Sequence, residues 1–236
     1  MRGRSRDRSS GARSVRTSPN VRGVDVVISI EPPKPWPYAA AILSGGQSKR
    51  MGVPKAGMVL PDGRSMIERI RDMLASFCHR VVLVGETYGL AGHQCLDDER
   101  TGRGPLAGIE ALLSSGISPQ YLVVACDQPL LPAGLLSRLM VGDDDGLTYF
   151  SDPTRDRIHP LPCRIGAECL DVVQSLLDQE KRSLHRLVAG LGPEALGVPL
   201  EARETDLLFN VNDPGDVARL FQMLRKGEDA PDGESG

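Results

Sequence analysis

Tyr38-Ala39-Ala40-Ala41-Ile42-Leu43 is a continuous apolar run, and Ser44-Gly45-Gly46 follows it directly. Buried strands of parallel sheets have this composition, because other elements cover both of their faces. Two similar runs come later, at residues 81–84 and 121–125. The pattern predicts three buried parallel strands, the first of which leads into a glycine loop.

Helical patterns separate these strands. Ser65 and Glu68 form a capping box ahead of apolar residues that are spaced for one helix face. Pro105 occupies the first turn of a second helix, and a third helical pattern covers residues 135–140. Strands that alternate with helices imply a parallel sheet with right-handed crossovers. The sequence therefore predicts a Rossmann-like, three-layer α/β/α domain with a mostly parallel sheet.

The chain is less regular after residue 146. Residues 147–150 and 160–163 have the composition of strands, and proline makes the second of them an expected edge strand. A helix is expected at 168–177. A last helix should follow Asp213, with Pro214 at its first position.

Both ends of the chain differ in composition from the middle. Residues 1–36 are rich in Arg, Ser and Pro, and residues 227–236 are small and polar. We expect a disordered leader at 1–36, one domain at 37–226 and a disordered tail at 227–236. Residues 24–30 could form a short strand. The leader has the composition of a solvated tail, and its arginines and serines also fit a transit peptide.

Charge and composition exclude several classes of protein. The net charge is −3, and a net +6 over the first 22 residues leaves −9 for the rest, which argues against a nucleic-acid-binding domain. The sequence contains no run of 18 apolar residues, so it predicts no membrane-spanning helix. Five cysteines without a C-x-x-C pair favour reduced thiols over disulfides or zinc, which fits the cytoplasm. The four histidines also lack zinc-ligand spacing.

The loop after the first strand could bind a polyphosphate. Gly45 and Gly46 would let backbone N–H groups approach phosphates closely, and Arg50 and Lys55 would supply positive charge. The spacing matches neither a Walker A loop nor G-x-G-x-x-G. The alternative is a plain strand-to-helix turn with two solvated cations.

Acidic and amide side chains follow the later strands. Asp127 ends the third strand, where ligands of open α/β sheets bind, and its carboxylate could hold Mg²⁺. The alternative is a role in the turn that follows. Asp97 or Asp98 could accept hydrogen bonds from a nucleoside, or could belong to a polar loop. Asn210 and Asn212 could hold a polar ligand or serve the start of the last helix.

Together these segments resemble the molybdenum cofactor guanylyltransferases. The signature of that family is L-A-G-G-x-S-x-R-M-G-x-x-K, and residues 43–55 match it with Ser44 in place of alanine. Four further segments come in the order of the family: Gly104-Pro105-Leu106-Ala107-Gly108, Cys126-Asp127-Gln128-Pro129, Lys181-Arg182-Ser183-Leu184 and Asn210-Val211-Asn212-Asp213-Pro214. The resemblance covers residues 38–225.

The resemblance implies roles for particular residues. The implied GTP-binding residues are Leu43, Ser44, Gly45, Gly46, Lys55, Asp97 and Asp127. The implied catalytic residues are Lys55, Arg50 and Asp127, and Asp127 would hold the cofactor Mg²⁺. The implied pterin-binding residues are Asn210, Asn212 and Arg182. Val84 stands where a relative often has asparagine, so that nucleotide contact is in doubt here.

The implied reaction transfers GMP from GTP to molybdopterin and releases pyrophosphate, in the cytoplasm. GTP and molybdopterin are then the small-molecule partners. Other proteins of the cofactor pathway, or the apo-molybdoenzyme, are further candidate partners, whereas nucleic acid and membrane are not expected. The alternatives are a molybdopterin cytidylyltransferase, a sugar-phosphate nucleotidyltransferase, and a non-catalytic nucleotide-binding protein of the same fold.

Overall fold

One seven-stranded sheet runs through the chain. The computed structural model describes residues 35–45, 55–90, 92–97, 100, 102–141 and 146–228. The strands follow the order β3-β2-β1-β4-β6-β5-β7 across the sheet. Their bounds are β1 Trp36–Leu43, β2 Cys78–Val84, β3 Cys95–Leu96, β4 Gln120–Ala125, β5 Leu147–Asp152, β6 Arg157–Gly166 and β7 Ala195–Pro199. Within this sheet only β6 runs opposite to the other strands, so the predicted mostly parallel sheet is confirmed.

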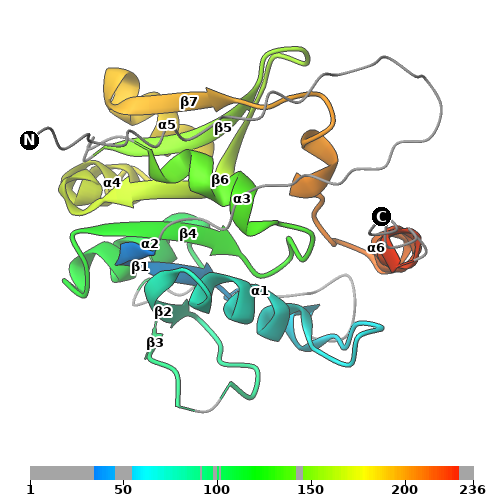
Figure 1. Cartoon of the computed structure of the whole chain (residues 1–236). Helices are drawn as coiled ribbons and strands as arrows, with labels where there is room; N and C mark the ends of the chain where they lie inside the picture. The colour runs from blue at the N-terminus through cyan, green and yellow to red at the C-terminus, as the bar shows by residue number, and fades with distance from the viewer. Residues whose placement is uncertain are drawn as a thin grey trace, which may run out of the picture.

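Helices cover both faces of the sheet and make three layers (Figure 1). The apolar core on one face lies under α2 (Pro105–Ser114), α4 (Leu170–Asp178) and α5 (Leu184–Leu191). The core on the other face lies under α1 (Met66–Ala75) and α3 (Ala133–Ser137). Alternate residues of β1 enter the two cores, with Ala41 and Leu43 in the first and Ile42 in the second, as strand geometry requires.

The start of α1 follows the sequence pattern. The Ser65 hydroxyl accepts a hydrogen bond from the Glu68 N–H at 3.3 Å, and the Glu68 carboxylate accepts one from the Ser65 N–H at 2.7 Å. These two bonds are the predicted capping box, and they satisfy backbone donors that a helix start leaves unpaired. The helix therefore begins where the sequence places it.

The expected edge strand is an internal strand. β6 lies between β4 and β5, so the prediction from its prolines was wrong. Cys163 pairs with Tyr149 and His159 pairs with Phe150, so residues 160–162 bulge out of the ladder, and β4 pairs with β6 only over residues 163–166. The prolines are tolerated because they lie in this bulge, where few ladder hydrogen bonds are needed.

The boundaries of the domain differ slightly from those expected. β1 begins at Trp36, whose indole is buried and meets the ring of Tyr38 edge to face, so Trp36 belongs to the sheet and not to the leader. At the other end, α6 (Pro214–Glu228) continues two residues past the expected limit of 226. The candidate strand at 24–30 lies outside the described residues.

α6 lies beside the sheet and not against it (Figure 1). Leu220 on this helix packs with Leu60, which lies ahead of α1, with Met66, the first residue of α1, and with Val211 just ahead of α6. This small apolar cluster fixes the segment around Val211 next to the end of β4.

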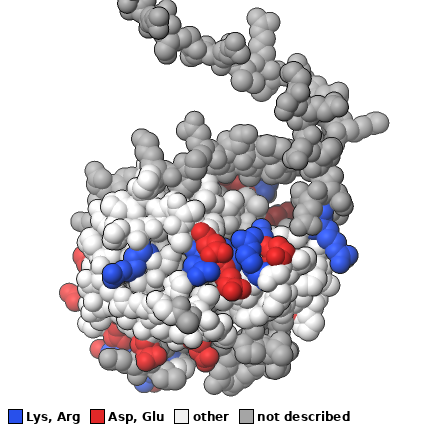
Figure 2. Space-filling model, turned by 60° about the horizontal axis from the view of Figure 1, so that its bottom comes forward, with Lys and Arg blue, Asp and Glu red and all other residues white. Residues whose placement is uncertain are grey.

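On the face drawn in Figure 2, basic and acidic side chains lie beside one another, and ion pairs of this kind join Arg64 and Arg69 to Asp62.

Candidate active site

A cavity of about 580 Å³ opens where β1 and β4 end; we call it the main cavity. Its wall comes from the residues after β1, the first residues of α2, residues 125–128, residues 157–161 of β6 and the start of α5. A smaller cavity of about 190 Å³, the side cavity, shares Leu43, Gly45 and Gly104 with it and extends towards Gly108. Both lie beyond the carboxyl ends of parallel strands, the usual place for ligands in open α/β sheets.

The glycine loop is pinned to the end of β2. Gly85 has a φ of 110°, and a Cβ on it would lie 2.4 Å from the backbone nitrogen of Gly45, so only glycine fits at this contact. The N–H groups of Ser44 and Gly45 both donate to the Val84 carbonyl, at 2.9 and 3.1 Å. The residues that follow β1 and the residues at the end of β2 are thereby held together at the floor of the site.

Ser44 lies behind the cavity wall. Its side chain is buried, and its hydroxyl donates to the carbonyl oxygens of Glu86 at 2.6 Å and Val84 at 3.1 Å. Leu43 and Gly45 line both cavities, whereas Ser44 lines neither. The predicted contacts of Leu43, Ser44 and Gly45 with a nucleotide stay predictions, and the geometry favours Leu43 and Gly45.

Most of the signature loop lies outside the described residues. Gly46 and Arg50 fall in the range 46–54, for which the structure gives no placement. Lys55 begins a short 3-10 helix, Lys55–Gly57, and its side chain is also outside the described part of the chain. The roles of these three residues therefore rest on the sequence.

Asp127 is one of the predicted residues that line the main cavity. It is half-buried in the wall of the main cavity, directly after β4. Its carbonyl oxygen accepts a hydrogen bond from the Val211 N–H at 2.9 Å, which ties the segment ahead of α6 to the end of β4. This bond brings Asn210 to the cavity wall.

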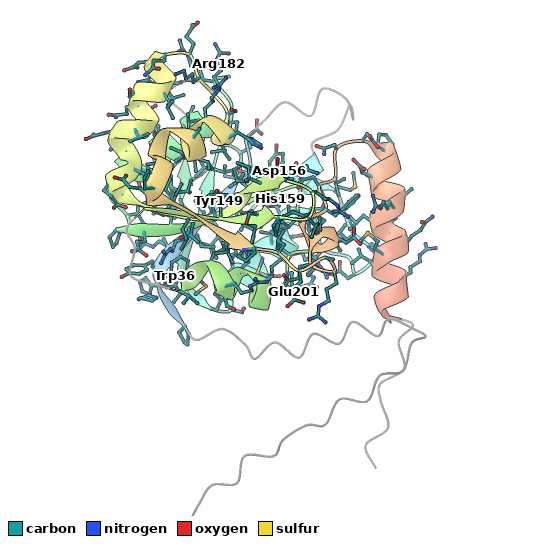
Figure 3. The ribbon with its side chains drawn as sticks, turned by 90° about the horizontal axis from the view of Figure 1, so that it is seen from above. Trp36, Tyr149, Asp156, His159, Arg182 and Glu201 are labelled. Atoms are coloured by element: carbon teal, nitrogen blue, oxygen red, sulfur yellow. The ribbon has the colours of Figure 1, made fainter. Side chains whose placement is uncertain are left out.

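The remaining predicted residues separate into two groups. Arg182 lines the main cavity together with Asn210 and Asp127, so these three predicted residues are brought together. Figure 3 shows Arg182, in the loop ahead of α5, near one end of the molecule and His159, on β6, closer to its centre. Asn212 does not line the cavity, and its N–H donates to the Asp216 carboxylate at 2.7 Å, within the first turn of α6.

Asp97 lies away from this group. It is exposed after β3 and lines a different cavity of about 430 Å³, formed with Cys95 and the outer face of α2. Asp98 lies outside the described residues. The predicted nucleoside contact therefore stays a prediction, and the described geometry does not bring Asp97 to either cavity of the site.

The start of α2 faces both cavities. Gly104 precedes the helix with a φ of 75°, no side chain caps its first turn, and no acidic residue lies there. Unpaired N–H groups at a helix start, together with the helix dipole, attract anions. A Cβ on Gly108 would lie 3.1 Å from Val84, so the small residue also brings α2 close to β2.

Gln128 and His159 are among the polar residues of the main cavity that the sequence did not predict as site residues. Gln128 is 3% exposed, and its amide Nε2 donates to the Leu161 carbonyl at 3.3 Å. His159 is half-buried, and burial together with the charge of Arg157 lowers its pKa. Gln128 belonged to a motif in which only the aspartate was assigned a role. The spacing of the four histidines argues against a zinc site, and it carries no other signal for His159.

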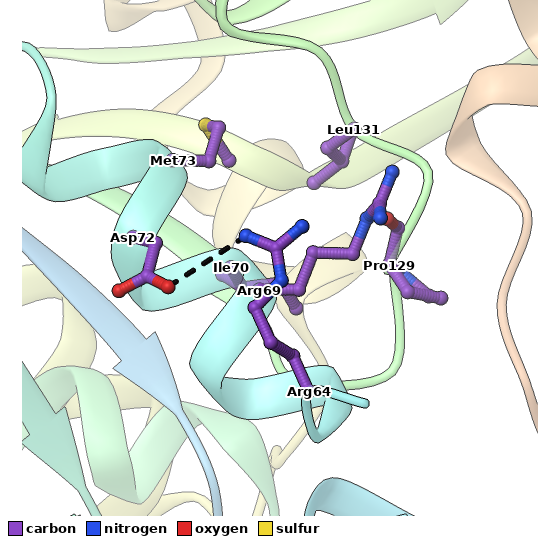
Figure 4. A pocket seen from close by; sticks show the side chains of 7 residues that line it. All are labelled: Arg64, Arg69, Ile70, Asp72, Met73, Pro129 and Leu131. Carbon is purple, nitrogen blue, oxygen red and sulfur yellow. Dashed lines mark hydrogen bonds and ion pairs between the residues drawn. The ribbon is translucent and has the colours of Figure 1, made fainter. Parts of the chain in front are cut away.

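Another cavity, of about 340 Å³, lies beside α1 (Figure 4). It contains Arg64 and Arg69, but both guanidinium groups are paired with Asp62, at 2.7 and 3.0 Å, and Arg64 also lies 3.7 Å from Asp72. The positive charges of Arg64 and Arg69 in this cavity are therefore neutralised by acidic side chains of the same chain. The cavity has no residue of the predicted site in its wall.

Metal and membrane features can be stated for the described residues only. They contain no group of three or more His, Cys, Asp or Glu side chains placed to hold a metal ion. In the same part of the chain, no helix has the length and apolar character needed to span a bilayer.

Comparison with known proteins gives a consistent picture. A family model described as MobA-like NTP transferase domain matches residues 40–195. A molybdenum cofactor guanylyltransferase from Rhizobium meliloti is 32% identical over 205 residues, which cover 80% of this chain and 93% of that protein. A relative of the same name from Desulfosudis oleivorans is 27% identical over 79% of this chain and 95% of its own length.

Solved structures share the fold. The molybdopterin-guanine dinucleotide biosynthesis protein A of Archaeoglobus fulgidus has a TM-score of 0.65 at 23% identity, over 80% of this chain and 99% of that one. The 2-C-methyl-D-erythritol 4-phosphate cytidylyltransferase of Thermus thermophilus has a TM-score of 0.59 at 17% identity, over 80% of this chain and all of that one. These two likenesses show that the chain shares its fold with both proteins.

Proposed function

This chain belongs to the MobA-like NTP transferase family, and from that premise we propose that it transfers GMP from GTP to the terminal phosphate of molybdopterin. It is a nucleotidyltransferase, and its relatives at about 30% identity carry the name molybdenum cofactor guanylyltransferase. The observation that carries the proposal is the pair of adjoining cavities, which share the glycine loop and the start of α2. Two joined cavities suit two substrates that react with each other.

The nucleotide takes the side of the site around the glycine loop and α2. Phosphate groups there meet the start of α2, which carries no acid and no side-chain cap. Lys55 and Arg50 add positive charge from the signature loop. The acceptor takes the main cavity, where Asn210 and Arg182 provide an amide and a guanidinium group for a polar anionic ligand.

A divalent metal ion is the usual cofactor of nucleotidyltransferases, and we propose Mg²⁺ held by Asp127. Mg²⁺ takes one or two protein carboxylates and completes its shell with substrate phosphates and water, so one half-buried aspartate at the cavity wall fits it. When bound, the ion neutralises charge on the phosphates of GTP.

The reaction needs positioning more than proton transfer. An oxygen of the acceptor's terminal phosphate attacks the α-phosphorus of GTP and forms a new P–O bond with it. The bond between the α-phosphorus and the oxygen that bridges it to the β-phosphorus breaks. Pyrophosphate leaves with the electron pair of that bond. The acceptor oxygen is already anionic, so the chain supplies orientation and charge neutralisation through Lys55, Arg182 and the start of α2.

Two linked measurements test this proposal. The first is thermal stabilisation of the protein by GTP, CTP, ATP and UTP, each with Mg²⁺, because a ligand of the folded state raises stability by mass action. GTP should give the largest shift. The second is pyrophosphate release, which should require GTP and molybdopterin together. A larger shift with CTP would favour the cytidylyltransferase alternative, and binding without pyrophosphate release would favour a non-catalytic protein.

A further inference from the structure

The bulge in β6 creates the main cavity. β4 and β6 pair as far as Val123 and Cys163, and beyond that point residues 160–162 leave the ladder. The last residues of β4, which pair with β1 on one side, therefore have no paired strand on the β6 side among the described residues; we call this break in the pairing the β4–β6 gap. Residues from both sides of this gap line the cavity.

Gln128 bridges the gap. Its amide Nε2 donates to the carbonyl oxygen of Leu161, which lies in the bulge. Because a carbonyl accepts and cannot donate, this bond fixes the orientation of the amide, and Oε1 points away from Leu161. Oε1 is buried and has no hydrogen-bond partner among the described residues.

A second side chain of the same cavity is also unsatisfied. The Nε2 of His159 is buried without a partner. The described residues contain five such side-chain atoms, and these two belong to residues that line the main cavity. Buried polar groups without partners are costly, and a cavity wall is where a ligand can supply the missing partner.

The chemistry of these atoms selects the kind of ligand group. Gln128 Oε1 only accepts hydrogen bonds, and a phosphate has no donor for it at neutral pH. The pyrimidine edge of a pterin, like that of guanine, carries an amino group and a ring N–H, which are donors. The proposed function gives the main cavity to the pterin, so the pterin edge is the one that these atoms would meet. Phosphate charge is served elsewhere on the wall, by the guanidinium groups of Arg157 and Arg182.

We propose that Gln128 and His159 read the pyrimidine edge of the pterin, with Gln128 Oε1 accepting a hydrogen bond from its 2-amino group. This inference rests on the proposed function, because it takes a pterin as the acceptor. Gln128 thereby both closes the β4–β6 gap and recognises the substrate. His159 Nε2 makes the second contact on the same edge.

The test compares two small probes in the intact protein without nucleotide. Pterin-6-carboxylate carries the 2-amino group, and lumazine-6-carboxylate has an oxygen in its place. The wild type should bind the pterin about tenfold more tightly, as measured by fluorescence titration, because a site built to accept a hydrogen bond rejects an analogue that lacks the donor. Equal binding of both probes by the wild type overturns the proposal without the need for any variant.

Variants assign the discrimination to these side chains. Gln128→Met should bring the ratio of the two affinities to near one while leaving GTP affinity unchanged. Gln179→Met, the same change at an exposed position on the far end of α4, should leave the ratio as in the wild type. A folded Gln128→Met protein that still prefers the pterin tenfold overturns the role of Gln128.

His159→Phe tests the second contact. It should weaken pterin binding at least threefold, and unchanged binding removes His159 from the proposal. The outcome is separable from that of the proposed function. A protein that makes no guanine dinucleotide but prefers pterin over lumazine refutes the guanylyl transfer and keeps this inference. A protein that makes the guanine dinucleotide but binds pterin and lumazine equally keeps the guanylyl transfer and refutes this inference.

Discussion

Asp127 and Gln128 are neighbours in the chain and face the main cavity with different chemistry. Asp127 offers a half-buried carboxylate, which suits a hard cation. Gln128 offers a neutral, buried amide that is already tied to the β6 bulge. The turn after β4 can therefore serve the phosphates and metal of one substrate and the ring of the other.

Replacing Asp127 by asparagine separates a metal ligand from a turn residue. Asparagine keeps the shape of the side chain but not its charge, so the variant should fold, need roughly tenfold more Mg²⁺ for half-maximal rate, and stay slower at saturation. A turn role predicts little change, because asparagine serves turns nearly as well. Mg²⁺ titrations of the transfer rate decide, and superimposable curves for wild type and variant remove Asp127 from the site.

Ser44 has a structural role at the floor of the site. Ser44→Ala removes the hydroxyl that donates to the Glu86 and Val84 carbonyls, and should lower the free energy of unfolding by about 1 kcal/mol. For a chain of this size that is a fall in Tm of roughly 2–4 °C. GTP affinity, measured by calorimetry, should not change, because the hydroxyl points away from both cavities. Lost GTP affinity at an unchanged Tm would contradict this.

At the residue scale the sequence predicted the motifs better than their geometry. Asp127, Asn210 and Arg182 do line one cavity, because strand ends and helix starts gather at one edge of a parallel sheet. Asp97 lines another cavity, because spacing along a loop does not determine where its side chains face. The sequence did not predict that Gln128 and His159 line the cavity, because their positions depend on the β6 bulge. That bulge depends on pairing between segments that are distant in the sequence.

Among the elements, those with local signals were predicted and those without were missed. β1, β4 and α1 carry continuous apolar runs or a capping box, and they form where expected. β3 has only two residues, which is too short for a periodic signal. The internal position of β6 was missed because proline argues for an edge only where the ladder is intact, and here the prolines lie in a bulge.

The β5–β6 hairpin gives a prediction on pH. Asp152 accepts hydrogen bonds from the side chain and N–H of Thr154, and the side-chain bond is the main cause of its lowered pKa. A carboxyl whose pKa is lower in the folded state stabilises the protein above its unfolded value, near 3.9, and loses that contribution as the pH falls through the folded value. Asp152→Asn should therefore lower the urea midpoint at pH 7.

The same variant should approach the wild type as the pH falls from about 4 through the lowered folded-state pKa of Asp152, because only below that pKa is the wild-type side chain as neutral as asparagine. Asp156→Asn is the matched control, since Asp156 is exposed on the same hairpin (Figure 3) and asparagine tolerates its positive φ. A difference between Asp152→Asn and wild type that does not shrink in acid would show that the charge of Asp152 is not what stabilises the hairpin.

The residues ahead of β1 give a prediction for the chain as a whole. Deleting residues 1–34 should preserve guanylyl transfer and Tm, because β1 starts at Trp36 and every described site residue comes after it. Deletion through Tyr38 should lower Tm, since it removes a buried indole and its edge-to-face contact. Circular dichroism melts and the transfer rate test both. A truncated chain that folds but does not transfer would assign a function to the leader.

The identity of the pterin product shows whether the chain is a guanylyltransferase. Purified protein is incubated with molybdopterin, Mg²⁺ and equal concentrations of GTP and CTP. The pterin products are identified by mass spectrometry, and the amount of pyrophosphate released is measured. We predict the guanine dinucleotide as the main product, with one pyrophosphate released for each molecule formed. A cytosine dinucleotide as the main product, or no dinucleotide from a folded protein, would contradict the account.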